Sequence, residues 1–380
     1  MNSTFSTDLK IGVLGGGQLG RMLIQAAIDL GIDLKIMDEE NAPCSQYAAH
    51  FTCGDIRNHE EVVEFGKNLD ILTIEIENVN VDALKELESH GVNVYPQPNV
   101  IELIQDKGLQ KQFYEKIGVP TAPYKLLKDI TDLETEIEFL PAVQKLRKGG
   151  YDGKGVTAIE SGENIQNGFD APSVLEKFVD LDKELSVIVS RNNKGEITTF
   201  PVVEQEFNPE ANLVEFLFSP ADITTAIQEQ AEAYAIKIIE QLDMVGILAV
   251  EFFLDRSGNL FVNEVAPRPH NSGHQTIEGN YTSQFQQHLR AISGLPPGAT
   301  EIILPSVMIN LLGEKGSEGE AHYEGLEEIL KWKGVYPHIY GKSISKPFRK
   351  MGHITVVNKD LTEAKKLALK VKETIRVIGK

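Results

Sequence analysis

Residues 251–276 read EFFLDRSGNLFVNEVAPRPHNSGHQT and predict a β-hairpin followed by a polar loop. The turn around residues 256–259 joins two strand-like stretches, with Glu251 in the first and Glu264 in the second. Side chains opposite each other on one face of such a pair lie roughly 5 Å apart. Two facing carboxylates suit a Mg²⁺ ion on the phosphates of ATP. The alternative is a hairpin with solvated acids, but the Arg, His and Asn cluster that follows favours a functional site.

The composition is that of a globular protein of two or three domains. The 380 residues are 41% hydrophobic and 24% charged, and the net charge is −19. This acidity argues against a nucleic-acid partner, which requires clustered Lys and Arg. No apolar run approaches the roughly 20 residues of a membrane span, and no signal peptide is recognisable. Cys44 and Cys53 lack metal-site spacing, so we expect reduced thiols and a cytoplasmic protein.

The first hundred residues alternate between strand and helix patterns. Apolar strands are expected at 11–14, 33–37, 71–76 and 92–94, and helices at 19–30 and 81–90. Such βαβ alternation predicts a parallel sheet. We therefore place an N-terminal Rossmann-like domain at residues 1–100.

The remaining chain predicts two further units. A single helix is expected over 100–117, ending at Gly118, before a proline-containing connector. Strands at 139–145, 156–159, 173–178 and 184–190 around a glycine-rich loop suggest a small α+β domain over 101–180. A long helix at 223–242, the acidic hairpin and a final basic hairpin within 335–356 form the third unit, 181–380.

Gly15, Gly17 and Gly20 form a GxGxxG pattern between a strand and a helix. Backbone amides at such a turn meet phosphate groups, and Asp38 stands where a dinucleotide fold places its ribose-binding acid. The pattern alone would suggest NAD. Because no dehydrogenase-like arrangement follows, we favour a phosphate-bearing substrate at this turn.

A second glycine-rich loop spans Lys145–Gly155 with the sequence KLRKGGYDGKG. Its glycines allow amides to fold over phosphates, and Lys145 and Lys154 supply positive charge. The GxxxxGK[ST] spacing of a Walker loop is absent. The alternative is a flexible basic turn. Lys107, on the preceding helix, is either a further phosphate-binding lysine or a surface residue.

Other polar residues are weaker candidates. Acidic side chains in the strand TIEIEN, 73–78, lie where the carboxyl end of a parallel strand faces a ligand crevice, unless that strand end is solvated. Backbone groups around Glu176 are candidates for an adenine edge and Glu184 for a ribose. His270 and His274 bracket Asn271–Gly273 beside Arg268, and we expect them to bind a small anion.

Four motifs together resemble a known family: GGGQLGRM at 15–22, TIEIENV at 73–79, GGYDGKG at 149–155 and NEVAPRPHNSGH at 263–274. They are similar to the biotin-independent ATP-grasp carboxylases of purine synthesis, the N5-carboxyaminoimidazole ribonucleotide synthase family. The resemblance covers essentially the whole chain. It implies an ATP-grasp architecture, α/β and α+β, with a Rossmann-like parallel-sheet domain, a small lid and a C-terminal domain.

The resemblance also assigns the nucleotide and metal site. The ATP phosphates would contact Lys107, Lys145 and the loop Gly150, Tyr151, Asp152, Gly153, Lys154, Gly155 and Val156. The adenine would be lined by Glu176, Lys177, Phe178 and Val179, with Glu184 on the ribose. Glu251 and Glu264 would hold Mg²⁺, with Asn263 beside them.

The implied chemistry is carboxylation of aminoimidazole ribonucleotide through carboxyphosphate, formed from bicarbonate and ATP. Arg268, His270 and Asn271 would hold the bicarbonate or carboxyphosphate, with Tyr151 and Asp152 also in the catalytic set. The ribonucleotide would contact Gln18, Leu19, Glu75, Glu77, Lys342, Arg349 and Lys350 as well as Tyr151 and Asp152. A homodimer is also implied.

Two departures from the family pattern and two rival hypotheses remain. Residues 201–209 read PVVEQEFNP, without the histidine that relatives carry near ATP, and Lys346 replaces a usual arginine. One rival is another ATP-grasp enzyme, such as the formate-dependent glycinamide ribonucleotide transformylase. The other is a non-catalytic nucleotide-binding or NAD-sensing protein.

Overall fold

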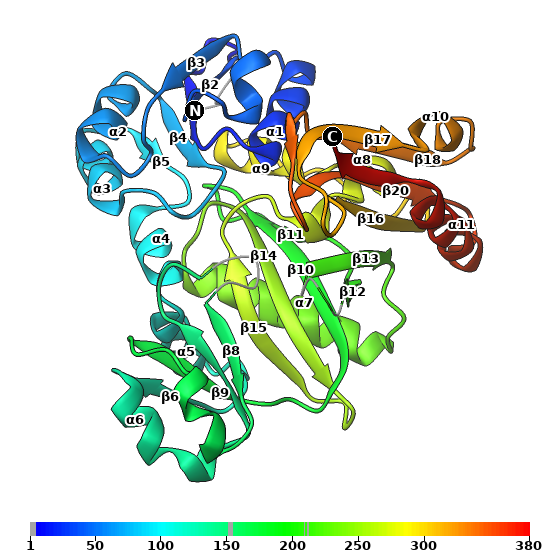
Figure 1. Ribbon diagram of the computed structural model, residues 1–380. Coiled ribbons are helices and arrows are strands. Elements are labelled where there is room, and N and C mark those ends of the chain that lie inside the picture. The colour runs from blue at the N-terminus through cyan, green and yellow to red at the C-terminus, as the bar shows by residue number, and fades with distance from the viewer. Residues whose placement is uncertain (1–4, 151–154, 209, 211–212) are drawn as a thin grey trace.

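The N-terminal region is a five-stranded parallel sheet of order β3-β2-β1-β4-β5 in the computed structural model, which describes residues 5–150, 155–208, 210 and 213–380 (Figure 1). The predicted parallel sheet is therefore confirmed. The strands are β1 (Ile11–Leu14), β2 (Leu34–Asp38), β3 (His50–Cys53), β4 (Ile71–Ile74) and β5 (Asn93–Val94). The connections are α1 (Gln18–Asp29), η1 (Pro43–Gln46), α2 (His59–Gly66) and α3 (Val81–Ser89).

The single helix expected over 100–117 is wrong, because the structure has two helices, α4 (Pro98–Ile104) and α5 (Lys107–Ile117). Asp106 between them has extended backbone angles, and its carboxylate accepts hydrogen bonds from the amides of Gly108 and Leu109. It is therefore an N-cap, which starts a new helix at Lys107. Gly118 ends α5 in the left-handed conformation, as the sequence predicts.

A small four-stranded antiparallel sheet follows, of order β6-β9-β7-β8. Its strands are β6 (Tyr124–Leu127), β7 (Ala142–Leu146), β8 (Val156–Ile159) and β9 (Ser173–Lys177). One side carries α6 (Ile130–Thr135), η2 (Ile137–Phe139) and η3 (Gly162–Asn167). This unit lies at the end of the molecule farthest from the N-terminal sheet in Figure 1.

The largest layer is a nine-stranded antiparallel sheet of order β15-β14-β10-β12-β13-β16-β20-β18, with β11 beside β10. Its strands are β10 (Leu181–Arg191), β11 (Ile197–Thr199), β12 (Val203–Asn208), β13 (Leu213–Ser219), β14 (Gly246–Asp255), β15 (Leu260–Ala266), β16 (Ser306–Leu312), β18 (Val335–Ile339) and β20 (Lys350–Val357). The antiparallel pairing of β18 and β20 confirms the predicted C-terminal hairpin.

One face of β10 and β14 packs on helix α7 (Thr225–Gln241). Leu185, Val187 and Val250 point into that core. Because side chains alternate along a strand, Glu184 and Glu251 lie on the opposite face. The alternation thus places the polar residues of the hairpin away from the core.

The C-terminal elements complete the fold. Phe285 and Leu289 of α9 (Gln284–Ile292) pack with Leu23 of α1 in one core, which joins the N-terminal sheet to the rest. The remaining elements are η4 (Asn271–Gly273), α8 (Thr276–Gly279), α10 (Leu326–Ile329), α11 (Leu361–Thr374) and the three-stranded sheet of β17 (Gly319–Glu324), β19 (Ile344–Ser345) and β21 (Arg376–Gly379). Among the described residues, no helix has the length and apolar character needed to cross a bilayer.

Candidate active site

The two acidic residues of the hairpin lie where the sequence predicts them. In the β14–β15 pair, Val250 lies opposite Val265 and Phe252 opposite Val262, so Glu251 and Glu264 meet at a register shift between these positions. Burial, followed by the Glu264 carboxylate, raises the pKa of Glu251 above its usual range. The two carboxylates are therefore electrostatically coupled across the hairpin, as expected for a cation site.

Lysines from two other elements converge on this end of the hairpin. The ammonium of Lys107, at the start of α5, forms an ion pair with the Glu264 carboxylate and lowers its pKa. Lys145 at the end of β7 donates to the side-chain oxygen of Asn263 at 2.9 Å and to Glu176 at 3.1 Å. Lys107 is therefore paired with an acid of the hairpin and is not a solvated surface residue, whereas its contact with phosphate stays a prediction.

Lys111 is a buried lysine beside the candidate site that the sequence analysis does not name. It lies one helical turn after Lys107 and is 2% exposed, with its ammonium 3.3 Å from Glu176. Glu176 is thus held between Lys111 and Lys145, and its adenine contact stays a prediction. The signal was present, because residues at i and i+4 share a helix face. Because Lys107 is a candidate for the nucleotide site, its position on the helix also makes Lys111 a candidate for a residue near that site.

Hydrogen bonds fix both ends of the glycine-rich loop. Arg147 donates through Nε and Nη2 to Asp106, at 2.8 Å each, and its carbonyl accepts from the Lys107 amide at 2.9 Å. The Leu146 amide donates to the Gly155 carbonyl at 2.8 Å, and Gly155 has a φ of 72°. The base of the loop is thereby tied to the start of α5. Tyr151, Asp152, Gly153 and Lys154 lie outside the described residues.

Glu184 on β10 lies in the same electrostatic environment. Burial raises the pKa of Glu184 to about 7, with Lys145 acting in the opposite direction and Glu264 in the same one. Both neighbours belong to the predicted nucleotide site, so Glu184 lies in a suitable place for a ribose contact. The contact itself stays a prediction. Lys177, Phe178 and Val179 follow at the end of β9, where Phe178 is exposed. Their adenine contacts also remain predictions.

Arg268, in the loop after β15, is paired with an acid of the N-terminal region. Its Nε and Nη2 donate to the two carboxylate oxygens of Glu77 at 2.5 and 3.1 Å. His270 lies close by, with Nε2 3.9 Å from Glu251, and burial followed by Arg268 lowers the pKa of His270 to about 3. A neutral His270 and a fixed Arg268 therefore border the acidic hairpin.

Asn271 and His274 are less accessible than the sequence suggests. Asn271 forms a reciprocal amide pair with Asn310 of β16, at 2.9 and 3.0 Å. His274 is 1% exposed and stacks on His353 with ring centroids 4.6 Å apart, and His353 stacks on His338 at 4.4 Å. The expectation that His274 binds an anion is wrong, because its ring is enclosed in this histidine stack. Anion binding by Asn271 stays a prediction.

The GxGxxG turn is filled by the protein's own carboxylates. The amide of Gly16 donates to Asp38 at 2.6 Å and that of Leu19 donates to Glu75 at 3.0 Å. A Cβ on Gly17 would lie 2.5 Å from a Glu75 oxygen, so the glycine is needed for this close approach. These two amides therefore have partners within the protein, and the phosphate-bearing substrate expected at this turn stays a prediction. Burial raises the pKa of Glu75 to about 7.

Lys350 of the basic tail lies near the site. Lys350 is a cation close enough to His270 to contribute to its lowered pKa. Lys342 donates to the Lys350 carbonyl at 2.7 Å, whereas the exposed Arg349 donates to the Ile344 carbonyl at 2.7 Å. The departure Lys346 is exposed and lies 3.2 Å from Glu318. Substrate contacts for Gln18, Lys342, Arg349 and Lys350 stay predictions.

The segment that lacks the histidine contributes to an apolar cluster. Phe207 packs against Val203, Val214 and Met308 on the sheet. Gln205, two residues earlier, is buried, with its amide nitrogen 3.5 Å from Glu251. A buried amide of this segment thus lies beside the acidic hairpin.

The donor set fits Mg²⁺. No cluster of three or more His, Cys, Asp or Glu able to hold a metal occurs in the described part of the chain. A Mg²⁺ bound by one or two carboxylates needs no such cluster, because phosphate oxygens and waters complete its coordination. Burial and then the neighbouring Glu264 carboxylate raise the pKa of Glu251, and a bound cation would favour the charged form of this carboxyl group.

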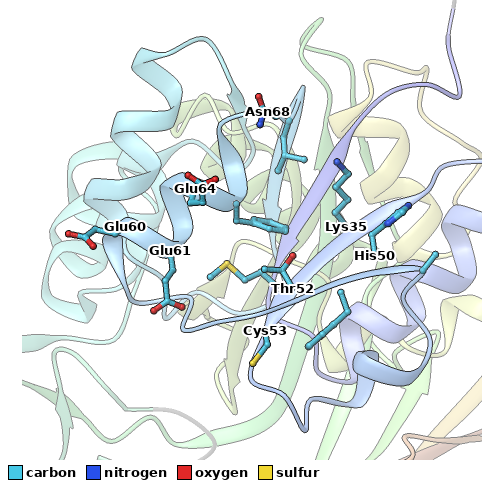
Figure 2. A pocket seen from close by; sticks show the side chains of 13 residues that line it. Lys35, His50, Thr52, Cys53, Glu60, Glu61, Glu64 and Asn68 are labelled. Atoms are coloured by element: carbon cyan, nitrogen blue, oxygen red, sulfur yellow. The ribbon is translucent and has the colours of Figure 1, made fainter.

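A cavity lies away from the candidate site. It encloses about 730 Å³ at the outer edge of the N-terminal sheet. Figure 2 shows Glu60, Glu61 and Glu64 of α2 on one side and Lys35 and His50 of β2 and β3 on the other. Of the residues that the structure describes, none that we assign to the site lines this cavity.

Comparison with known proteins follows the same division of the chain. The ribonucleotide synthetase preATP-grasp domain family matches residues 9–105, and the ATP-grasp domain family matches residues 112–285. The phosphoribosylaminoimidazole carboxylase C-terminal domain family matches residues 306–367. The first two matches meet near the break between α4 and α5. The expected ATP-grasp architecture is confirmed, whereas the boundaries at residues 100 and 180 stay predictions.

Relatives and solved structures agree on the family. The N5-carboxyaminoimidazole ribonucleotide synthase of Bacillus subtilis is 39% identical over 353 residues, covering 91% of this chain and 90% of that protein. A chloroplastic phosphoribosylaminoimidazole carboxylase of Vigna aconitifolia is 37% identical, but the chain spans only 65% of its length.

Among solved structures, the synthetase from Thermotoga maritima has a TM-score of 0.91 and 41% identity, covering 98% of this chain and 100% of that one. The synthase from Aspergillus clavatus, in complex with ADP and 5-aminoimidazole ribonucleotide, has a TM-score of 0.88 and 33% identity, covering 96% and 98%. The chain therefore belongs to the N5-carboxyaminoimidazole ribonucleotide synthase family of ATP-grasp ligases.

Proposed function

We propose that this protein carboxylates the exocyclic amine of 5-aminoimidazole ribonucleotide, using ATP and bicarbonate and releasing ADP and phosphate, in purine biosynthesis. Membership of the synthase family supports this activity, as does the Aspergillus clavatus relative, which was solved with ADP and the ribonucleotide. The single observation that carries it is the convergence of Lys107, Lys145 and Asn263 on Glu264 and its partner Glu251. Such a set binds and polarises a nucleotide triphosphate.

The residues of the nucleotide site have distinct tasks in this proposal. Lys107 and Lys145 bind the phosphates and offset the charge that develops as the γ-phosphoryl group is transferred. Glu251 and Glu264 would hold Mg²⁺, which supplies further charge neutralisation when it is bound. Lys107 forms an ion pair with Glu264. Binding of a nucleotide would replace part of this internal pairing with contacts to phosphate.

Arg268 and His270 form the anion side of the site. Arg268 is fixed by Glu77 through two nitrogens, and its charge lies beside the neutral His270 ring. This pair holds bicarbonate and then carboxyphosphate in the proposed reaction, while bicarbonate attacks the γ-phosphate. Carboxyphosphate or the CO₂ it releases then carboxylates the amine. Exclusion of water protects this intermediate, and the buried setting of His270 serves that purpose.

The ribonucleotide is proposed to lie against the N-terminal turn and the basic tail. Glu75 and Leu19 form one wall, and Lys350 supplies positive charge near His270. The net charge of −19 does not oppose this, because a local basic group decides binding of a small phosphate ester. A homodimer in the cytoplasm is further implied by the resemblance, and sedimentation equilibrium of the purified chain tests the dimer.

The decisive experiment measures ADP release from Mg·ATP with and without aminoimidazole ribonucleotide across a bicarbonate titration. Release that rises with both substrates, with trapping of the carboxylated product, establishes the proposed reaction. Release that requires formate and a different amine would support the transformylase hypothesis. No release under any condition would contradict both enzymes and leave a nucleotide-binding protein. NAD binding at the GxGxxG turn is disfavoured, because Asp38 and Glu75 occupy its amides.

A further inference from the structure

Lys111 has an unusual environment for a lysine. It lies on α5 and is 2% exposed, whereas lysines are almost never fully buried unless paired. Its ammonium has three partners: the Thr121 hydroxyl at 2.7 Å, the Glu176 carboxylate at 3.3 Å and the Asn263 carbonyl at 3.4 Å. An ammonium has three hydrogens, so all of its donors are used inside the protein. Lys111 is therefore not placed to contact a substrate.

The partners of Lys111 are the same residues that hold Lys145. Glu176 offers one carboxylate oxygen to Lys111 and the other to Lys145. Asn263 offers its backbone carbonyl to Lys111 and its side-chain oxygen to Lys145, at 3.4 and 2.9 Å. The two lysines therefore share two acceptors, one on β9 of the small sheet and one on β15 of the hairpin.

We propose that Lys111 is a positioning residue for the nucleotide site, which holds Glu176 and Asn263 so that the Lys145 ammonium stays directed at the phosphates. This inference rests on the proposed nucleotide binding. Without Lys111, one oxygen of the buried Glu176 carboxylate loses its cation. Lys145 is then the remaining cation on Glu176, and the stronger pairing draws it away from Asn263 and the ligand.

The position of this network explains why it would affect binding. Thr121 also donates to the Val262 carbonyl at 2.7 Å, so the connector before β6 is attached to β15 one residue before Asn263. Lys111 thereby joins α5, the small sheet and the acidic hairpin at one point. These contacts hold the small sheet against the nine-stranded sheet at the place where Lys145 interacts electrostatically with Glu264.

The test replaces Lys111 by methionine, which retains much of the volume and removes the charge. We expect Lys111→Met to weaken binding of ADP at least tenfold by titration calorimetry, and to raise KM for ATP while leaving KM for the ribonucleotide unchanged. The matched control is Lys237→Met. Lys237 donates to the Gly118 carbonyl at 3.4 Å at the end of the same helix, and has no hydrogen bond or ion pair with a site residue in the described part of the chain. ADP affinity within twofold of the parent in Lys111→Met would overturn the proposal.

A double-mutant cycle distinguishes positioning from general destabilisation. If Lys111 acts mainly through Glu176, adding Lys111→Met to Glu176→Gln causes a much smaller loss of ADP affinity than Lys111→Met causes alone. A further tenfold loss in that background would overturn the proposal. This comparison also serves if Lys111→Met alone fails to fold, because the double variant removes both buried charges. Absence of ADP binding by the parent protein would instead contradict the proposed function.

Discussion

Arg268 and Glu77, 191 residues apart in sequence, form a two-pronged ion pair with N–O distances of 2.5 and 3.1 Å. Glu77 follows β4 of the N-terminal sheet, and Arg268 follows the acidic hairpin. Burial acts to raise the pKa of Glu77. The charge and hydrogen bonds of the Arg268 guanidinium act in the opposite direction, and the pKa lies below its usual range. The pair connects two layers of the molecule at the proposed bicarbonate position.

The geometry of this pair can be tested by Arg268→Lys. Lysine keeps the charge but cannot form the planar fork, so we expect KM for bicarbonate to rise at least tenfold while ADP affinity stays unchanged. Arg268→Ala should abolish bicarbonate-dependent ADP formation. Steady-state kinetics with calorimetry measure both. Normal turnover of Arg268→Ala at saturating bicarbonate would contradict the assignment.

Glu264→Gln tests the metal assignment. The substitution conserves volume and removes the charge that pairs with Lys107, so we expect ADP release to fall at least a hundredfold with little change in the thermal unfolding midpoint. Glu206→Gln is the matched control, because Glu206 is an exposed acid on β12. ADP release by Glu264→Gln at the parent rate would show that this carboxylate holds no essential metal.

The Asp106 carboxylate has two roles that different substitutions separate. Asp106→Asn retains an oxygen that caps α5 but loses the ion pair with Arg147, whereas Asp106→Ala loses both. We expect Asp106→Ala to be less stable than Asp106→Asn by about 1 kcal/mol. Both should raise KM for ATP, because Arg147 anchors the glycine-rich loop to Lys107.

Thermal unfolding and ATP kinetics measure these effects. Asp360→Asn is the control, since Asp360 caps α11 through Thr362 and Glu363 on the surface. An unchanged KM for ATP in both Asp106 variants would contradict the prediction that the ion pair between Asp106 and Arg147 supports ATP binding.

His288 makes the protein sensitive to acid. Its ring is fully buried and lies 2.9 Å from the Thr73 hydroxyl, and burial lowers its pKa to about 3. In the unfolded chain this histidine is protonated below about pH 6.5, whereas in the folded protein it stays neutral down to about pH 3. The free energy of unfolding therefore falls as the pH decreases from 6.5 towards 3. The loss for this histidine is about 1.4 kcal/mol per pH unit.

Replacing the histidine should remove that contribution. We expect His288→Gln to be less stable than the parent at pH 7.5, with the difference smaller by about 1.4 kcal/mol at pH 5.5, one unit below the unfolded pKa. Urea unfolding at the two pH values measures it. Thr73→Val is the control, because it removes the hydrogen-bond partner and keeps the titrating ring. A difference that is the same at both pH values would contradict the prediction.

Local patterns in the sequence determined much of this protein. Alternation of apolar strands and amphipathic helices was enough to predict the parallel sheet, since both periods are set by the residues of one segment. The hairpin around residues 256–259 likewise brought Glu251 and Glu264 together without information from elsewhere. The single helix expected over 100–117 was wrong because Asp106 caps a new helix, and its carboxylate also binds Arg147, which follows 41 residues later in the chain.

Only the tertiary structure decided which charges meet. Glu75 fills the glycine turn at Leu19, Glu77 fixes Arg268, and Glu176 is shared between Lys111 and Lys145. Each of these pairs joins segments that pack together through apolar cores, so no local period records them. A buried charge must find a partner, but the sequence does not say which one. The partner is the group that the packed layers bring within hydrogen-bonding distance.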